Sequence, residues 1–254
     1  MLTSTSTSGS YAVTVLSIVL LGFSLGMRHA TDPDHVVAVT TIVARERTLR
    51  GAALLGSLWG VGHTLTIVLV GGAIVVFGVV IPTRVGLTME LSVAIMLMLL
   101  GAINVGGVAR HARATAGHAA AHGPHDHPEG SLGRLDRGLG HLGVYQLARP
   151  LVVGVVHGLA GSAAVALLVL GTIRDPRWAI GYLLVFGLGT IAGMMLITAA
   201  LAMPFAFTAR RFSRLNGWLG LASGLLSLAF GAFLVYQIGF VDGLFTAHPR
   251  WTPG

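Results

Sequence analysis

The sequence predicts an all-α, polytopic membrane protein, and three observations support this fold class. Of the 254 residues, 54% are hydrophobic and only 10% are charged, whereas soluble domains have about 25% charged residues. The mean hydropathy is +0.81. Long apolar stretches recur along the chain, and a membrane-spanning helix needs about 20 predominantly apolar residues. The six predicted spans are 11–27, 52–81, 91–108, 151–173, 178–206 and 215–241.

The first span differs from the other five, which are long enough on their own. Residues 11–27 reach spanning length only by running into the polar motif that follows them. Residues 1–10 contain no basic residue and no clear cleavage site. We therefore interpret them as an N-terminal tail rather than a signal peptide.

The distribution of arginine predicts the orientation in the membrane. Eleven arginines lie in the segments after the first, third and fifth spans, and four lie in the segments on the opposite side. Cytoplasmic loops carry an excess of basic residues. Both termini are therefore predicted to lie outside, and the segment 109–149 is predicted to be cytoplasmic.

Three pairs of similar motifs suggest an internal repeat. Their offsets are 128, 127 and 130 residues, which predicts two halves of three spans each. Because each half has an odd number of spans, the second half is inverted relative to the first, as in many secondary transporters. The alternative is a chance similarity among Gly-rich membrane helices. The pairs are GMRHATDP (26–33) with GVVHGLAG (154–161), WGVGHTLT (59–66) with FGLGTIAG (186–193), and LGAINV (100–105) with FGAFLV (230–235).

The domain organisation follows from this repeat. The segment between the halves is rich in alanine, glycine and histidine, with little apolar surface to bury, so it is predicted to be disordered. Its histidines either bind metal loosely or are incidental to a solvated linker. The predicted parts are an N-terminal tail 1–10, a first half 11–108, a His-rich linker 109–149, a second half 150–241 and a C-terminal tail 242–254.

The segment GMRHATDPDH (26–35) interrupts the apolar sequence with ionisable side chains. Such a side chain at the bilayer centre costs about 2.5–3.5 kcal/mol on insertion scales, so these groups need partners or a ligand. Arg28 and Asp32 have the spacing of an i,i+4 ion pair on a helix. Pro33 lacks a backbone donor and disfavours helix at the residue before it. The helix is therefore predicted to break or kink inside the motif.

His29, Asp34 and His35 form an H-x4-D-H pattern of candidate metal ligands. Imidazole and carboxylate without thiolate suit nickel, cobalt or zinc, whereas calcium and magnesium prefer oxygen ligands. Asp32 supplies a second carboxylate to balance a divalent ion, and Arg28 is expected to neutralise Asp32 when the site is empty. The alternative is an interfacial motif at the end of a short first span.

Two further histidines are candidates for completing the site. His63 lies deep in the second span, with Thr64 beside it, and His157 is the repeat counterpart of the first motif histidine, with Ser162 nearby. Because His157 has no acidic neighbour, it is either a secondary ligand or a pore-lining group together with Ser162. The alternative for His63 is a role in hydrogen-bonded packing, the role expected for Asn104 and Gln237.

Missing residue types and motifs exclude several functions. The chain has no cysteine, which excludes disulfides, thiolate metal sites and iron–sulfur clusters. It has neither the H-E-x-x-H motif of zinc proteases nor the G-x-x-x-x-G-K-[ST] motif of ATP hydrolysis. The net charge of +7 reports orientation in a membrane protein rather than nucleic-acid binding. The remaining redox alternative is an intramembrane electron carrier with haem between His63 and His157.

With HATDPDH in an early span and WGVGHTLTIV in the next, the chain resembles the nickel/cobalt transporter family. The first motif matches the family's H-x4-D-H signature at each ligand position. The resemblance implies that these three signature residues recognise the metal, with Asp32 alongside and His63 contributing from the neighbouring helix.

The resemblance also implies a secondary transporter and not an enzyme. It would be a bacterial cytoplasmic-membrane protein that takes up Ni²⁺ or Co²⁺ and has no permanently bound cofactor; export through the same site is the alternative. Classical members have eight spans and an acidic motif in the second half, whereas residues 186–194 here read FGLGTIAGM. The chain is thus similar to a distant branch of the family, some of whose members are described as urease accessory membrane proteins. The implied partners are the urease machinery or a cytoplasmic nickel chaperone.

Overall fold

A computed structural model describes residues 4–44, 46, 48–79, 81–118, 148–160, 173 and 175–251. Over these residues the secondary structure consists of helices and their connections, without a strand. Four helical segments of the described part are long and apolar enough to cross a membrane: Leu49–Phe77, Thr83–Ala109, Pro176–Thr208 and Leu215–Val241. The prediction of an all-α, polytopic membrane protein is confirmed.

The four long segments correspond to the second, third, fifth and sixth predicted spans, and the first predicted span lies within the helix Ser4–His29. The shorter apolar helices are Pro33–Val43 and, at the start of the fourth predicted span, Ala148–Ala160. The helix Ala148–Ala160 is named by its residue range. The labelled elements are α1 (Ser4–His29), α2 (Pro33–Val43), α3 (Leu49–Thr66), η1 (Ile67–Gly71), α4 (Gly72–Phe77), α5 (Thr83–His118), α8 (Pro176–Arg211), α9 (Ser213–Tyr236) and η2 (Gln237–Val241), of which η1 and η2 are π-helical turns. Helix α5 includes the first ten residues of the predicted linker 109–149.

Prolines and capping residues determine where α2 and α8 begin. Pro33 occupies the first turn of α2, where its missing N–H is not needed, and Asp32 before it has an extended backbone with φ −60° and ψ 145°. Helix α8 begins at Pro176 in the same way, and the Asp175 side chain accepts a hydrogen bond from the backbone N–H of Arg177. The helix break predicted from Pro33 is therefore present.

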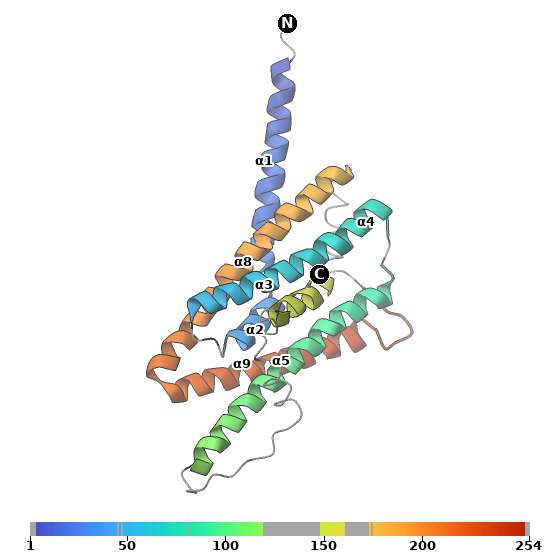
Figure 1. Cartoon of the computed structure of the whole chain (residues 1–254). Coiled ribbons are helices and arrows are strands. Elements are labelled where there is room, and N and C mark those ends of the chain that lie inside the picture. Colours follow the sequence, from blue (N-terminus) through green and yellow to red (C-terminus); the bar gives the residue numbers. More distant parts are fainter. Residues whose placement is uncertain are drawn as a thin grey trace.

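Two helix pairs, each joining one helix from each half, form the main body of the molecule. Helix α3 lies along α8, and α5 lies along α9 (Figure 1). Glycines allow close approach in both pairs. A Cβ atom on Gly60 would lie 2.8 Å from the Ile191 backbone, and one on Gly101 would lie 2.6 Å from the carbonyl oxygen of Gly224. Small residues are the usual means by which membrane helices pack closely.

The packing of the helices repeats at the offset found in the sequence. Gly154 lies against the backbone carbonyl of Trp59, and Gly26 lies against that of Phe186. The two glycines are 128 positions apart, and the two aromatic residues are 127 positions apart. A second set of contacts is related in the same way: Gly62 with Leu151, and Gly189 with Phe23. The contacts between helices therefore repeat at the same offset as the motifs.

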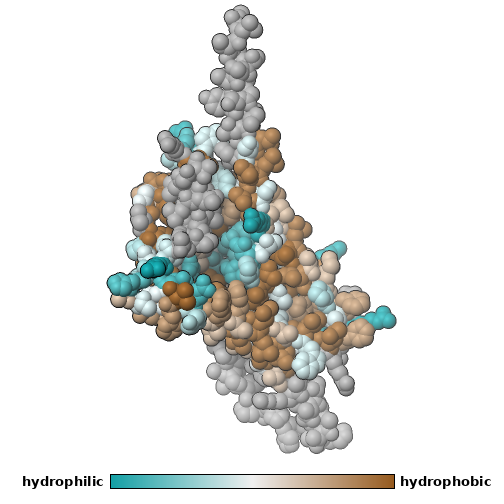
Figure 2. All heavy atoms as spheres, turned by 180° about the vertical axis from the view of Figure 1, so that it is seen from behind, coloured by the Kyte–Doolittle hydropathy of each residue, from teal (hydrophilic) through white to brown (hydrophobic). Residues whose placement is uncertain are grey.

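The outer surface carries many large hydrophobic side chains. Leu69, Phe77 and Trp218 are 63%, 77% and 69% exposed, respectively. Figure 2 shows hydrophobic residues over much of the described surface, with hydrophilic residues gathered in a smaller region near the middle of that face. Extended apolar surface of this kind indicates contact with a membrane.

The described residues after η2 lie back against α5. The Arg84 guanidinium donates hydrogen bonds to the backbone oxygens of Leu244 and Thr246, both at 3.0 Å. The indole Nε1–H of Trp251 donates to a carboxylate oxygen of Glu90 at 2.8 Å. The segment predicted as a C-terminal tail is therefore packed on the helices as far as Trp251.

Candidate metal centre

The predicted metal ligands lie where the helix breaks between α1 and α2. Helix α1 ends at His29, the chain turns through residues 30–32, and helix resumes at Pro33. This restart places Asp34 and His35 in the first turn of α2. The proline therefore directs two side chains from one helix and one from the preceding helix towards the same region.

Four segments bring five candidate ligands together at this break. His29 comes from α1, Asp34 and His35 from α2, His63 from α3 and His157 from Ala148–Ala160. His35, His63 and His157 are only 2%, 0% and 1% exposed. Burial of several ionisable groups in a membrane protein is costly and marks functional sites.

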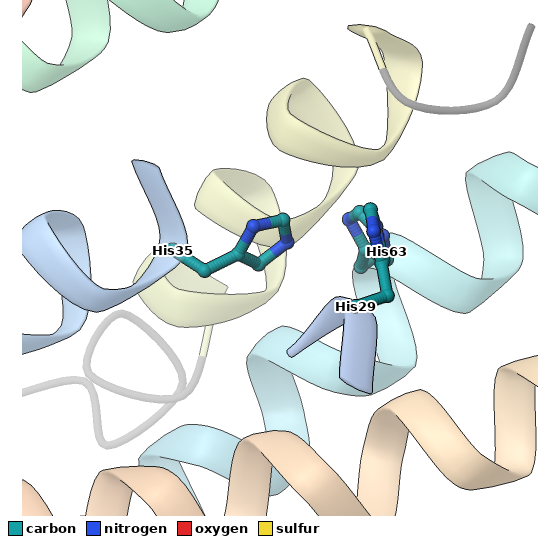
Figure 3. A group of neighbouring side chains, drawn as sticks. All are labelled: His29, His35 and His63. Carbon is teal, nitrogen blue, oxygen red and sulfur yellow. The ribbon is translucent and has the colours of Figure 1, made fainter. Parts of the chain in front are cut away.

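The five residues form two groups that share His35. One group contains His29, His35 and His63, and the other contains Asp34, His35 and His157. Within each group one ligand atom per residue lies within 4.8 Å of the others. In Figure 3 the outer edge of the His35 ring points towards the rings of His29 and His63. Imidazole and carboxylate groups in this arrangement are suited to a borderline divalent metal.

Direct contacts connect the members of each group. The Nε2 atoms of His29 and His63 are 3.0 Å apart, so one donates to the other, depending on their tautomers. Asp34 contacts two histidines: one carboxylate oxygen lies 2.8 Å from Nε2 of His157, and the other lies 3.0 Å from Nδ1 of His35. Asp34 is thus the charged residue that joins the second half to the motif.

Several buried nitrogens at this centre have no hydrogen-bond partner. They are Nε2 of His35, Nδ1 of His63, Nδ1 of His157 and Nε1 of the adjacent Trp59, whose ring stacks on His35 with 6.1 Å between centroids. A buried polar atom without a partner costs about 1–3 kcal/mol. In the part of the chain described here, these four are the only such side-chain atoms. Binding of a ligand through the three imidazole rings gives a physical reason for this concentration of unpartnered nitrogens.

Asp32 lies behind His29 rather than in either group. Its carboxylate oxygen is 2.7 Å from Nδ1 of His29, which leaves Nε2 of that ring to face His63. A carboxylate in this position orients a metal-binding imidazole and increases its basicity. The expected ion pair of Arg28 with Asp32 is absent, because α1 ends at His29 and the two residues do not share a helix. Arg28 is exposed and forms no ion pair within the described residues.

The other two supporting residues have different outcomes. The hydroxyl of Thr64 donates to the backbone oxygen of Gly187 at 3.1 Å, which joins α3 to α8. Thr64 belongs to neither ligand group. Ser162 lies outside the described residues. Asn104, expected in packing, donates to the oxygens of Gly220 and Ser223 on α9.

A cavity of about 490 Å³ borders the ligands and extends to residues that the sequence reasoning missed. His29, Asp34 and His157 lie on its wall. Its remaining lining includes the polar residues Asp32, Glu90, Gln237, Asp242 and Arg250, together with Trp251. Glu90 had a sequence signal, since it is an isolated acid within an apolar span. No motif marked Asp242 or Trp251, which reach the cavity only because the chain folds back after η2.

Fold and site together define a multi-pass helical membrane protein with a histidine and aspartate cluster at a broken helix. Comparison with known proteins then gives its family. The sequence is 34% identical over 233 residues to the urease accessory protein UreH of Bacillus sp. (strain TB-90). The aligned region covers 92% of this chain and 96% of the relative. The chain belongs to the UreH family, as expected for a urease-associated branch of the nickel/cobalt transporters.

The family is one of urease accessory proteins rather than of enzymes. No family model matches the sequence, and no solved structure matches it. The arrangement of the ligands described above therefore rests on this chain alone.

Proposed function

We propose that this protein is a secondary transporter that takes up Ni²⁺ or Co²⁺ across the bacterial cytoplasmic membrane. The observation that supports this function best is the meeting of four imidazoles and one carboxylate at a helix break. Secondary transporters bind their substrates near the bilayer midplane, on broken helices between inverted repeats. The break between α1 and α2 and the helix contacts that repeat at one offset support this function.

The ligand types favour nickel and cobalt over the common hard cations. Neutral imidazole suits late first-row divalent metals, and affinity increases from cobalt to nickel. Calcium takes six to eight oxygen ligands, whereas the two groups here are mainly nitrogen. The single carboxylate of Asp34 reduces the positive charge of a dehydrated ion within the membrane.

The membrane potential is the proposed source of energy. The chain contains no lysine and therefore no phosphate-binding motif of the ATPase type. A divalent ion moving inward gains about 4.6 kcal/mol per 100 mV, twice the value for one charge. This energy is sufficient to concentrate a trace metal about a thousandfold.

The proposed destination of the metal is the urease machinery. The relative from Bacillus is named a urease accessory protein, and the proposed cytoplasmic partner is urease itself or a nickel chaperone that serves it.

In the proposed membrane topology both termini lie outside and the segment 109–149 lies in the cytoplasm. Labelling of a single cysteine introduced at each terminus by a membrane-impermeant reagent would test this orientation, because cytoplasmic cysteines are protected.

Uptake of radioactive nickel by cells that express the protein tests the proposed function. His29→Ala and Asp34→Ala are expected to reduce uptake to the level of cells without the protein. His248→Ala is the matched control, because His248 is exposed and belongs to neither ligand group. All variants must be present in the membrane at equal amounts. Normal uptake by either ligand variant would rule out the proposed site.

The same cells distinguish uptake from export. Uptake increases cellular nickel and sensitivity to it, whereas export through the same centre decreases both. Purified protein with a haem absorption band would instead support the electron-carrier alternative. Equal accumulation with and without the protein would reject transport of nickel in either direction.

A further inference from the structure

The shared position of His35 has a consequence for how many places the metal occupies. Ligand atoms bound to one ion at about 2.1 Å are at most about 4.2 Å apart. A single ion bound by all five residues would therefore place all five ligand atoms within one group. The described residues instead form two groups of three, each with an internal limit of 4.8 Å, and only His35 belongs to both.

The ring positions place His35 between the other histidines. Its centroid is 4.8 Å from that of His29, 5.1 Å from that of His63 and 4.3 Å from that of His157. The centroids of His63 and His157 are further apart, at 6.3 Å. Nδ1 of His35 lies against Asp34, while Nε2 is buried without a partner. The ring of His35 thus contacts Asp34 through Nδ1, and its Nε2 has no partner. Figure 3 shows the outer edge of the ring facing His29 and His63.

The predicted inverted repeat distributes two counterpart histidines between the two groups. His29 and His157 are counterparts at an offset of 128 residues, and the helices that carry them make counterpart contacts through Gly26 and Gly154. In an inverted repeat the symmetry axis lies in the membrane plane. Counterpart residues therefore lie on opposite sides of that axis, and each of these two histidines belongs to a different group.

The two groups also differ in charge. The His29–His35–His63 group consists of neutral rings when it binds metal, whereas the Asp34–His35–His157 group includes a carboxylate. A divalent ion is attracted more strongly by the second group, while the first group is held in place by the contact of Asp32 with His29. Unequal positions that are close together allow an ion to move without complete rehydration.

We infer that the transported ion occupies two alternative positions, one in each group, and that His35 binds it in both. Because the two groups offer only one carboxylate to offset the charge of a divalent ion, one chain holds one ion at a time. This inference rests on the proposed function, because it describes the path of the transported metal. It assigns His35 as the ligand that is common to both positions of the ion.

Equilibrium binding of NiCl₂ to the purified full-length protein in detergent tests this inference. The wild type is expected to bind one ion. His63→Gln and His157→Gln each remove one position, so each variant should still bind one ion, through the position that remains. His35→Gln and the double variant His63→Gln/His157→Gln should lose at least about 100-fold in affinity, since no complete group remains. A single five-ligand site predicts a different pattern, in which each single variant binds as poorly as His35→Gln.

Two further measurements make the outcome decisive. Nickel X-ray absorption should give about three imidazoles per ion in His157→Gln and about two in His63→Gln. Gel filtration and thermal unfolding must show that all variants are folded. Two ions bound at once to the wild type, or equal losses in all single variants, would overturn the inference. If the inference is overturned but the wild type still takes up nickel in cells, the proposed function stands. If the wild type neither binds nickel nor takes it up, the proposed function fails as well.

Discussion

The helix pairs α3–α8 and α5–α9 have the same type of packing but different polar interiors. In both pairs, glycines lie against the backbone of the partner helix and allow close packing. At α5–α9 the buried polar groups are satisfied locally: Ser227 donates to the backbone oxygen of Leu97 at 2.8 Å, and Asn104 donates to α9. Around α3, four buried ring nitrogens lack partners. The comparison indicates that the α5–α9 pair serves stability, whereas α3 also contributes His63 to the ligand centre.

The largest expected effect follows from blocking the close approach of α5 and α9. Gly101→Val would place side-chain atoms against the backbone of Gly224 and Leu228, which cannot move without separating the helices. We expect destabilisation of about 3 kcal/mol, the upper end of the range for overpacking, measured by thermal unfolding in detergent. Nickel affinity of the protein that remains folded should be unchanged.

The control for this substitution is Gly217→Val, because a Cβ atom at Gly217 meets no other atom within 4 Å. Its unfolding temperature should stay close to that of the wild type. A Gly101→Val protein that is fully stable but loses nickel binding would reverse the roles assigned to the two helix pairs.

A smaller effect is expected from loosening the metal centre without removing a ligand. Asp32→Asn keeps the size of the side chain but weakens its hold on Nδ1 of His29. Loss of such a supporting carboxylate typically reduces metal affinity by about 10–100-fold. Nickel titration of the purified variant would measure this loss. Asp242→Asn is the control, since Asp242 borders the same cavity but is not part of a ligand group, and an equal loss in both variants would argue against a specific role of Asp32.

The smallest effect is expected for a single polar contact of the α5–α9 pair. Asn104→Leu removes the hydrogen bonds to Gly220 and Ser223. Hydrogen bonds between membrane helices contribute about 0.6 kcal/mol on average and at most about 1.7. The unfolding temperature should therefore fall slightly, and nickel binding should not change. A large loss of nickel uptake by this variant would show that the two pairs are coupled more closely than their contacts indicate.

Local sequence signals predicted the parts of the site that lie close together in the chain. The proline of the motif explains the break between α1 and α2, and it brings His29 near Asp34 and His35. The interhelical role of Asn104 is also confirmed. These predictions succeeded because they depend on backbone chemistry and on the cost of polar groups in lipid.

The long-range parts of the site could be proposed from the sequence but not placed. His63 and His157 were candidates because of their apolar surroundings and the repeat, yet only the fold shows which of them contacts Asp34. The expected pairing of Arg28 with Asp32 was wrong, because the i,i+4 rule holds only within a continuous helix. Asp242 and Trp251 were missed because their place at the cavity depends on the chain reversal after η2.

The contact between Trp251 and Glu90 has a practical consequence for handling the protein. The indole forms part of the wall of the cavity that borders the ligands, and only a few residues separate it from Gly254. A polyhistidine tag fused after Gly254 would place extra imidazoles within a few residues of Trp251 and of this cavity. Nickel titrations on such a fusion would measure binding to the tag together with binding to the protein, so the tag should be cleaved or placed elsewhere.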